Sequence, residues 1–237
     1  MFVPIQDDNP LRHIRFQIVT AFLIAANVAV FLLEALSLDQ ARIASFALVP
    51  SELFHLVPAG DFGHRAHEAP VIPERLTLLS YMFFHLDIFH LFGNMIFLWV
   101  FGDNVEDAMG HVRFLVFYLA CGVLAGLTHA FLQPGSPVPL IGASGAVAGV
   151  IAAYLVLHPR VRMWVLAFKI IPLRISAVWA LGAWIAMQLV MVALTMNRPE
   201  PIAWWAHVGG LVAGALLVLV LRRPGVPLFD KGLAKAT

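Results

Sequence analysis

Long apolar runs are the feature that most restricts how this chain can fold. A helix needs about 20 mostly apolar residues to cross a bilayer core of about 30 Å, and residues 16–36 and 202–221 form runs of that kind. Of the 237 residues, 61% are hydrophobic and only 12% are charged, whereas soluble domains carry about 25% charged residues. We therefore predict an all-α membrane protein that crosses the bilayer several times.

Polar residues, prolines and glycines divide the chain into six predicted spans. They are residues 16–36, 86–101, 112–132, 145–157, 176–196 and 202–221. These spans form one membrane domain, residues 16–221, between a tail of residues 1–15 and a tail of residues 222–237. The fourth span is the shortest and is expected to be central. The first loop, residues 37–80, is long, and its stretch "FALVPSELFHLV" is apolar enough to lie partly in the membrane interface.

The distribution of positive charge predicts the orientation. Six spans place all of the 15 Lys and Arg residues except Arg42, Arg65, Arg75 and Arg198 on the side that holds both termini. The positive-inside rule then puts both tails in the cytoplasm, and it puts the first loop outside. The N-terminus has no basic segment followed by a short apolar run and a small-residue cleavage site, so no cleaved signal peptide is expected. The net charge of +1 gives no indication of a nucleic-acid partner.

Three polar residues mark the outer ends of spans that run in the same direction. His90, Ser144 and His207 lie at the outer ends of the second, fourth and sixth spans. Residues 145–157 rise only about 20 Å as a helix, so we expect Ser144 to lie below the membrane surface. Non-helical backbone at that depth is tolerated only where protein surrounds it or water fills a cavity. We therefore predict a hydrated pocket around Ser144.

Pairs of glycines four residues apart predict close helix packing. They are Gly145 and Gly149, Gly210 and Gly214, and Gly122 and Gly126. The pairs in the fourth and sixth spans could bring the Ser144 hydroxyl within hydrogen-bond reach of the His207 ring. The alternative is that these glycines serve packing alone.

The same residues could perform acyl transfer. A serine becomes nucleophilic when a neighbouring base such as His207 takes its proton. The Ser144 N–H at a helix N-terminus and the side chains of His90 and Asn94 could stabilise an oxyanion. Each residue also has a simpler reading, since a Gly-x-Ser-Gly stretch can serve packing, His207 can be an interfacial histidine, and His90 and Asn94 can cap or join helices. Polar groups at membrane depth are nevertheless functional candidates by default.

Two stretches raise the possibility of a metal site. "HLDIFH" at residues 85–90 spaces its two histidines five apart, so that they diverge on a helix, and "HRAHE" at residues 64–68 lies in the first loop. Neither fits the H-E-x-x-H pattern of zinc proteases. We predict no metal and no cofactor.

Four motifs resemble the rhomboid family of intramembrane serine proteases. They are "HLFGNM" at 90–95, "GDNVED" at 102–107, "GASGAVAG" at 142–149 and "AHVGGLVAG" at 206–214. The resemblance covers residues 85–221 and implies a six-helix rhomboid-like bundle. It implies that Ser144 is the nucleophile, that His207 is the general base and acid, and that His90 and Asn94 form the oxyanion hole. Gly142 and Gly145 would set the geometry of the nucleophile loop, and Glu106 would be structural.

The resemblance also implies the substrates and the location. Rhomboid proteases cut single transmembrane helices or their flanks at small residues, so the expected partners are such proteins and the lipid bilayer itself. A compact six-span chain suits a bacterial inner membrane, with the site open to the outer side, and an organelle membrane is the alternative. Ala148 stands where many members place an aromatic ring against the catalytic histidine, and the first loop lacks their Trp-Arg pair. The alternatives are a non-proteolytic rhomboid-like chaperone or adaptor, and a small transporter.

Overall fold

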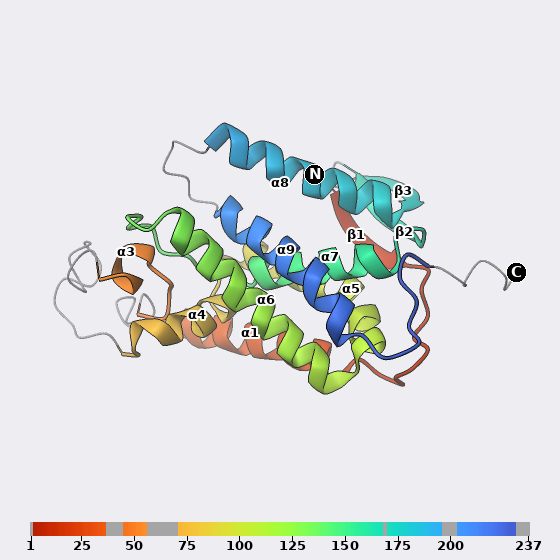
Figure 1. Ribbon diagram of the computed structural model, residues 1–237, viewed down its shortest axis with the longest axis horizontal. Helices are drawn as coiled ribbons and strands as arrows, with labels where there is room; N and C mark the ends of the chain where they lie inside the picture. The colour runs from red at the N-terminus through yellow and green to blue at the C-terminus, as the bar shows by residue number, and fades with distance from the viewer. Residues whose placement is uncertain (1, 37–44, 56–70, 168–169, 196–202, 231–237) are drawn as a thin grey trace, which may run out of the picture.

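The computed structural model describes residues 2–36, 45–55, 71–167, 170–195 and 203–230. Within these ranges the chain is mostly helical, with one small sheet (Figure 1). In chain order the elements are β1 (Phe2–Asp7), α1 (Ile18–Leu36), α3 (Pro50–Leu53), η1 (Glu74–Leu76), α4 (Thr77–Ser80), η2 (Tyr81–Phe83), α5 (Ile88–Met109), α6 (His111–Leu132), α7 (Ser144–Leu157), β2 (Arg162–Ala167), β3 (Ile171–Ser176), α8 (Ala177–Thr195) and α9 (Trp204–Leu221).

Among the described residues, five helices are long and apolar enough to cross a membrane. They are α1, α5, α6, α8 and α9, with 18 to 22 residues each. The predicted fourth span is α7, which has only 14 residues and rises about 21 Å. Large apolar side chains remain exposed on the outer helices, among them Leu33, Trp179 and Val220. The chain is therefore a multi-pass membrane protein, because lipid is the medium that would cover these side chains.

Helix α7 is the centre of the bundle. It packs against α5, α6 and α9, and its side chains from Gly145 to Tyr154 are all buried. Small residues allow this enclosure, since five of the eight residues that follow Ser144 are glycine or alanine. The expectation of a short central fourth helix is confirmed.

The predicted end of the second span was wrong. We expected a turn from residue 102 to 111, but α5 continues to Met109 and ends at Gly110, where φ is +85°. The acidic residues of this last section do not break the helix because other segments use them. Glu106 accepts hydrogen bonds from the Val19 and Thr20 backbone N–H groups at 2.9 and 2.8 Å. It thereby caps the start of α1, which supports the structural role implied for it.

The sheet was not predicted either, so "all-α" is correct only for the membrane helices. The connection after α7 forms the hairpin β2–β3, and the N-terminal tail supplies β1, in the order β1-β2-β3 with antiparallel pairing. In β2, Met163 and Val165 are buried while Arg162 and Trp164 are exposed. This alternation has the period of two that a strand requires, but it is short and lies between long apolar runs.

The segments that a six-span topology places on one side of the membrane lie together at one end of the bundle. Asp107 of α5 accepts hydrogen bonds from the backbone of Arg12 and His13. The Arg160 N–H, which follows α7, donates to Asp230 at 2.9 Å, and the Arg223 N–H donates to the Ala108 carbonyl at 2.8 Å. Figure 1 shows the strands at this end and α3 and α4 at the other.

The described part of the first loop packs against the loop that leads to α7. Leu48 and Leu140 exchange two backbone hydrogen bonds of 3.0 and 2.8 Å, and Leu48 is fully buried. The Ser51 N–H donates to the Ser136 carbonyl at 3.1 Å. Protein therefore satisfies this non-helical backbone, as membrane depth requires. Residues 37–44 and 56–70 of the predicted interfacial loop lie outside the described residues.

Candidate active site

The chain turns sharply just before Ser144, the first residue of α7. Gly142 has φ +117°, a conformation that favours glycine. A Cβ at Gly142 would also lie 2.7 Å from the His90 ring. The Gly142 N–H donates to the Tyr81 carbonyl at 3.0 Å, and the Ala143 N–H donates to His85 Nε2 at 3.4 Å. Space and conformation therefore both require glycine at position 142.

Helices α7 and α9 touch through their glycines. A Cβ at Gly210 would overlap the Gly145 carbonyl oxygen, and a Cβ at Gly214 would overlap the Gly149 carbonyl oxygen. The predicted close packing of the fourth and sixth spans is thus present. It brings His207, one turn before Gly210, beside Ser144. His207 Nε2 lies 2.8 Å from Ser144 Oγ, within hydrogen-bond distance.

Helix α5 brings His90 and Asn94 to the same place. Asp87 caps its N-terminus by accepting from the Phe89 and His90 N–H groups at 2.7 and 2.9 Å. The His90 ring lies against Gly142. Asn94 is buried one turn further in, and its Nδ2 donates to the His90 carbonyl at 3.1 Å. Two predicted oxyanion donors therefore stand next to the loop that carries Ser144, although their role stays a prediction.

The partner of the other His207 nitrogen was not predicted from the sequence. Gln188 of α8 places Oε1 2.7 Å from His207 Nδ1. The Trp184 and Trp204 rings lie near the His207 ring, with centroids 6.1 and 5.8 Å from its own. A signal was present, because Gln188 is the only amide side chain in a long apolar run and buried polar groups in membranes are functional candidates.

From its spacing in the sequence, His85 was considered only as a metal ligand. In the structure it accepts the Ala143 N–H and packs edge-on against His90, with ring centroids 5.1 Å apart. It thus helps to hold the turn before Ser144. No group of three His, Cys, Asp or Glu side chains among the described residues could hold a metal ion. Residues 64–68, the other stretch considered, lie outside the described ranges.

The arrangement has the parts that acyl transfer needs. A hydroxyl lies beside an imidazole nitrogen, and that imidazole has an acceptor on its far side. Ser144 begins α7, so its N–H belongs to the first turn, where helical N–H groups have no partner within the helix. His90 and Asn94 lie on the neighbouring helix. The candidate nucleophile, base and donors therefore meet at one end of α5, α7 and α9.

Comparison with known proteins gives a consistent family match. Residues 73–224 match the model of the Rhomboid domain. The chain is 29% identical over 164 residues to RHOMBOID-like protein 12, mitochondrial, of Arabidopsis thaliana. The aligned residues cover 62% of this chain and 46% of the relative. It is 29% identical over 175 residues to Rhomboid protease GluP of Bacillus subtilis (strain 168), covering 74% and 32%.

A third relative is Presenilin-associated rhomboid-like protein, mitochondrial, of Homo sapiens. The identity is 31% over 196 residues, which cover 81% of this chain and 45% of the relative. The matches therefore span less than half of the length of each of these three relatives. The match to the Rhomboid domain model includes every residue of the site described above, since all of them lie between residues 73 and 224.

Proposed function

Because the chain belongs to the rhomboid family, we propose that it is an intramembrane serine endopeptidase that hydrolyses peptide bonds in or next to transmembrane helices of membrane proteins. The observation that carries the proposal is the 2.8 Å approach of His207 Nε2 to Ser144 Oγ. A hydroxyl with a base at this distance is the arrangement that activates a serine. The family alone supports a rhomboid fold, and this pair supports the chemistry.

The reaction begins when His207 Nε2 takes the Ser144 hydroxyl proton and Oγ attacks the peptide carbonyl carbon. The carbonyl oxygen becomes an oxyanion, for which the Ser144 N–H, the His90 ring and the Asn94 amide are the proposed donors. Collapse of this intermediate breaks the C–N bond, and His207 gives its proton to the leaving amine. Water, deprotonated by His207, then cleaves the acyl-enzyme and restores Ser144.

The substrate class follows from the depth of the site. Helix α7 rises about 21 Å, less than a bilayer core of about 30 Å, so its first residue lies within the membrane region if its last reaches the interface. A peptide bond in a substrate helix is hydrogen-bonded and shielded. The segment must unwind before Oγ can attack, which favours helices that contain small or helix-breaking residues near the cut.

The proposed orientation places both termini and the sheet on the cytoplasmic side, with the Ser144 end of α7 towards the outside. The prediction of a bacterial inner membrane gains no support from the relatives, because two of the three described above are mitochondrial proteins by name. The lipid bilayer is the environment in either case.

The proposal is tested with purified protein in liposomes that contain a panel of single-span substrate peptides. We expect the wild type to release a cleaved fragment, and we expect Ser144→Ala, which removes one oxygen atom, to release none above background. His207→Ala should lose activity to a similar degree because the two residues act as a unit. Cleavage by Ser144→Ala, or no cleavage of any peptide by the wild type, would favour the alternative of a non-proteolytic chaperone or adaptor.

A further inference from the structure

Gln188 is the one amide that α8 turns towards the bundle. It is 1% exposed, and its neighbours on the same face of α8, Leu181 and Val192, are also buried. Its Oε1 lies 2.7 Å from His207 Nδ1. An amide at membrane depth is costly unless it has a partner, and the histidine ring supplies that partner.

This contact selects one form of the neutral imidazole. An amide oxygen can only accept a hydrogen bond, so Nδ1 must carry the proton. The proton is then absent from Nε2, whose lone pair faces the Ser144 hydroxyl. The opposite tautomer would place N–H against Ser144, and the ring could not take the proton of the nucleophile.

The contact between Gln188 and His207 also helps to hold the His207 ring in place. Ala148, one turn after Ser144, is fully buried but has only a methyl group. Helix α8 provides two groups that Ala148 cannot, since the Trp184 ring packs near His207 and the Gln188 oxygen fixes its tilt.

We propose that Gln188 is a positioning residue that holds His207 in the Nδ1-protonated tautomer required for base catalysis. The inference rests on the proposed protease function. It adds that α8, which carries neither Ser144 nor His207, must pack against α9 for His207 to act as a base. Loss of such an orienting partner typically costs about 10- to 100-fold in activity.

The test compares Gln188→Met, which keeps length but removes the acceptor, with Gln188→Glu, which can only accept. Val192→Ala, one turn further along the buried face, is the packing control. We expect Gln188→Met to lower kcat about 10- to 100-fold with KM nearly unchanged. Gln188→Glu should retain activity and move the acid limb of the pH–rate profile to higher pH, because a carboxylate stabilises the imidazolium. Val192→Ala should keep both kcat and the pH profile.

A second measurement needs no turnover. Nitrogen NMR of histidine-labelled protein, with His207 assigned from a His207→Gln spectrum, reports which ring nitrogen is protonated. We expect the Nδ1–H form in the wild type and a mixture of tautomers in Gln188→Met. The same tautomer in both proteins, or equal kcat losses in Gln188→Met and Val192→Ala, would overturn the inference. A wild type that cuts nothing but shows the expected tautomers would refute the protease function alone.

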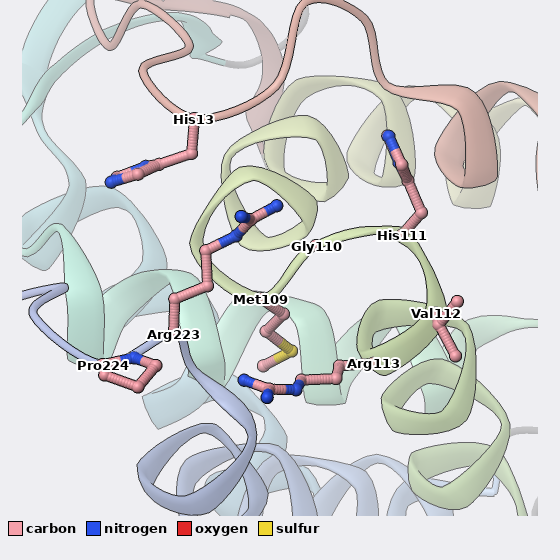
Figure 2. Close-up of a pocket in the computed structure, with 8 residues that line it drawn as sticks. All are labelled: His13, Met109, Gly110, His111, Val112, Arg113, Arg223 and Pro224. Carbon is pink, nitrogen blue, oxygen red and sulfur yellow. The ribbon is translucent and has the colours of Figure 1, made fainter.

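A separate observation concerns the opposite end of the molecule, where a cavity of about 570 Å³ opens between the α5–α6 turn and the end of α9. Figure 2 shows that Arg113 and Arg223 extend into this region, with His13 and His111 at its edges. Both histidines are already paired, His13 with Asp107 at 3.0 Å and His111 with Glu106 at 2.5 Å. The two guanidinium groups are therefore the charges available to a ligand.

The cavity is built around Arg223. The backbone N–H of Arg223 donates to the Ala108 carbonyl at 2.8 Å. This hydrogen bond fixes Arg223 against the end of α5. A Cβ at Gly110 would lie 2.8 Å from Arg223 Nη2, so the glycine leaves room for the guanidinium. Arg223 Nε is buried and has no hydrogen-bond partner. Among the residues that the structure describes, neither Arg113 nor Arg223 forms an ion pair.

We infer that this cavity, the Arg113–Arg223 pocket, binds the phosphate headgroup of an anionic phospholipid. Guanidinium groups match phosphate oxygens in geometry and charge. The pocket lies at the end of the bundle where helix ends meet, and basic pockets between helix ends on the cytoplasmic side suit such headgroups. A bilayer supplies this ligand at high local concentration, whereas free inorganic phosphate would have to bind from water.

The test measures the melting temperature of the detergent-solubilised protein with added short-chain phosphatidylglycerol, phosphatidylcholine or inorganic phosphate. We expect stabilisation by phosphatidylglycerol alone. The Arg113→Gln/Arg223→Gln variant should bind it about 30-fold more weakly, and Arg162→Gln, an exposed arginine of β2, should behave like the wild type. Arg113→Gln alone, at the exposed position, should weaken binding about fivefold. Equal stabilisation by phosphatidylcholine or by phosphate would overturn the inference. A wild-type response to phosphatidylglycerol in both Arg113→Gln and Arg113→Gln/Arg223→Gln would also overturn it.

Discussion

The contact between α7 and α9 sets the distance between Ser144 and His207, and Gly210→Ala tests this directly. The new Cβ would overlap the Gly145 carbonyl oxygen and would lie 3.0 Å from the Gly145 carbonyl carbon. An unstrained carbon pair needs about 3.5 Å, and the oxygen overlap is deeper, so the helices must separate by about 1 Å. Both partners are backbone atoms, which cannot rotate out of the way.

A separation of this size would move apart Ser144 and His207, the proposed catalytic pair. Ser144 is the residue before Gly145, and His207 lies one turn before Gly210, so the 2.8 Å distance between Nε2 and Oγ must lengthen. A misplacement of about 1 Å costs on the order of 100-fold in rate. Overpacking of this kind also costs about 1–3 kcal/mol of stability. We therefore expect a folded protein with activity reduced about 100-fold.

The matched control is Gly182→Ala. Gly182 lies in α8, and a Cβ there would have no atom within 4 Å. Alanine is the better helix former by about 1 kcal/mol, so this variant should keep wild-type activity and melt at an equal or higher temperature. The assay is peptide cleavage in liposomes, with melting measured on the same preparations. Wild-type activity in Gly210→Ala would refute the reasoning that this backbone contact sets the Ser144–His207 distance.

Three further predictions concern single side chains. Asn94→Ala should lower kcat about 100- to 1000-fold without loss of folding, because it removes one proposed oxyanion donor; unchanged kcat would exclude that role. Glu106→Gln should lower the free energy of unfolding by about 1.5–3 kcal/mol, since a charged acceptor of the Thr20 N–H and hydroxyl is replaced, and unaltered melting would contradict the capping role. Burial raises the pKa of Asp7 from 3.8 to about 6, so the unfolded chain loses this proton first and stability should fall by up to about 3 kcal/mol as pH rises from 4 to 6. Asp7→Asn, which can still accept from the Tyr154 hydroxyl, should remove that fall, and a parallel pH dependence of melting in both proteins would show that Asp7 is not its source.

The sequence was sufficient to locate the long helices, apart from the end of α5, and to predict that Ser144 and His207 lie together. Apolar length locates spans because lipid leaves a chain few alternatives to a helix. Ser144 and His207 could be paired because the glycines that follow each of them permit close contact. Because the fourth and sixth spans run in the same direction and pack closely, the two side chains could meet only at the outer ends of these spans.

The parts that were missed depend on contacts between distant segments. The last two turns of α5 look like a polar connection in the sequence, and only the hydrogen bonds from residues 12–20 to Glu106 and Asp107 explain why they are helical. The β1–β2 pairing joins residues more than 150 positions apart. Gln188 reaches His207 only because α8 docks beside α9, and hydropathy does not report which face of an apolar helix is turned inward.

The central claim is that His207 makes Ser144 a nucleophile. The most direct measurement is labelling with a fluorophosphonate probe, with the modified residue located by peptide mass spectrometry. We predict a single adduct on Ser144 in the wild type, none in Ser144→Ala, and a rate of labelling at least about 100-fold slower in His207→Ala. Labelling of another serine, or equal rates in the wild type and His207→Ala, would contradict the account.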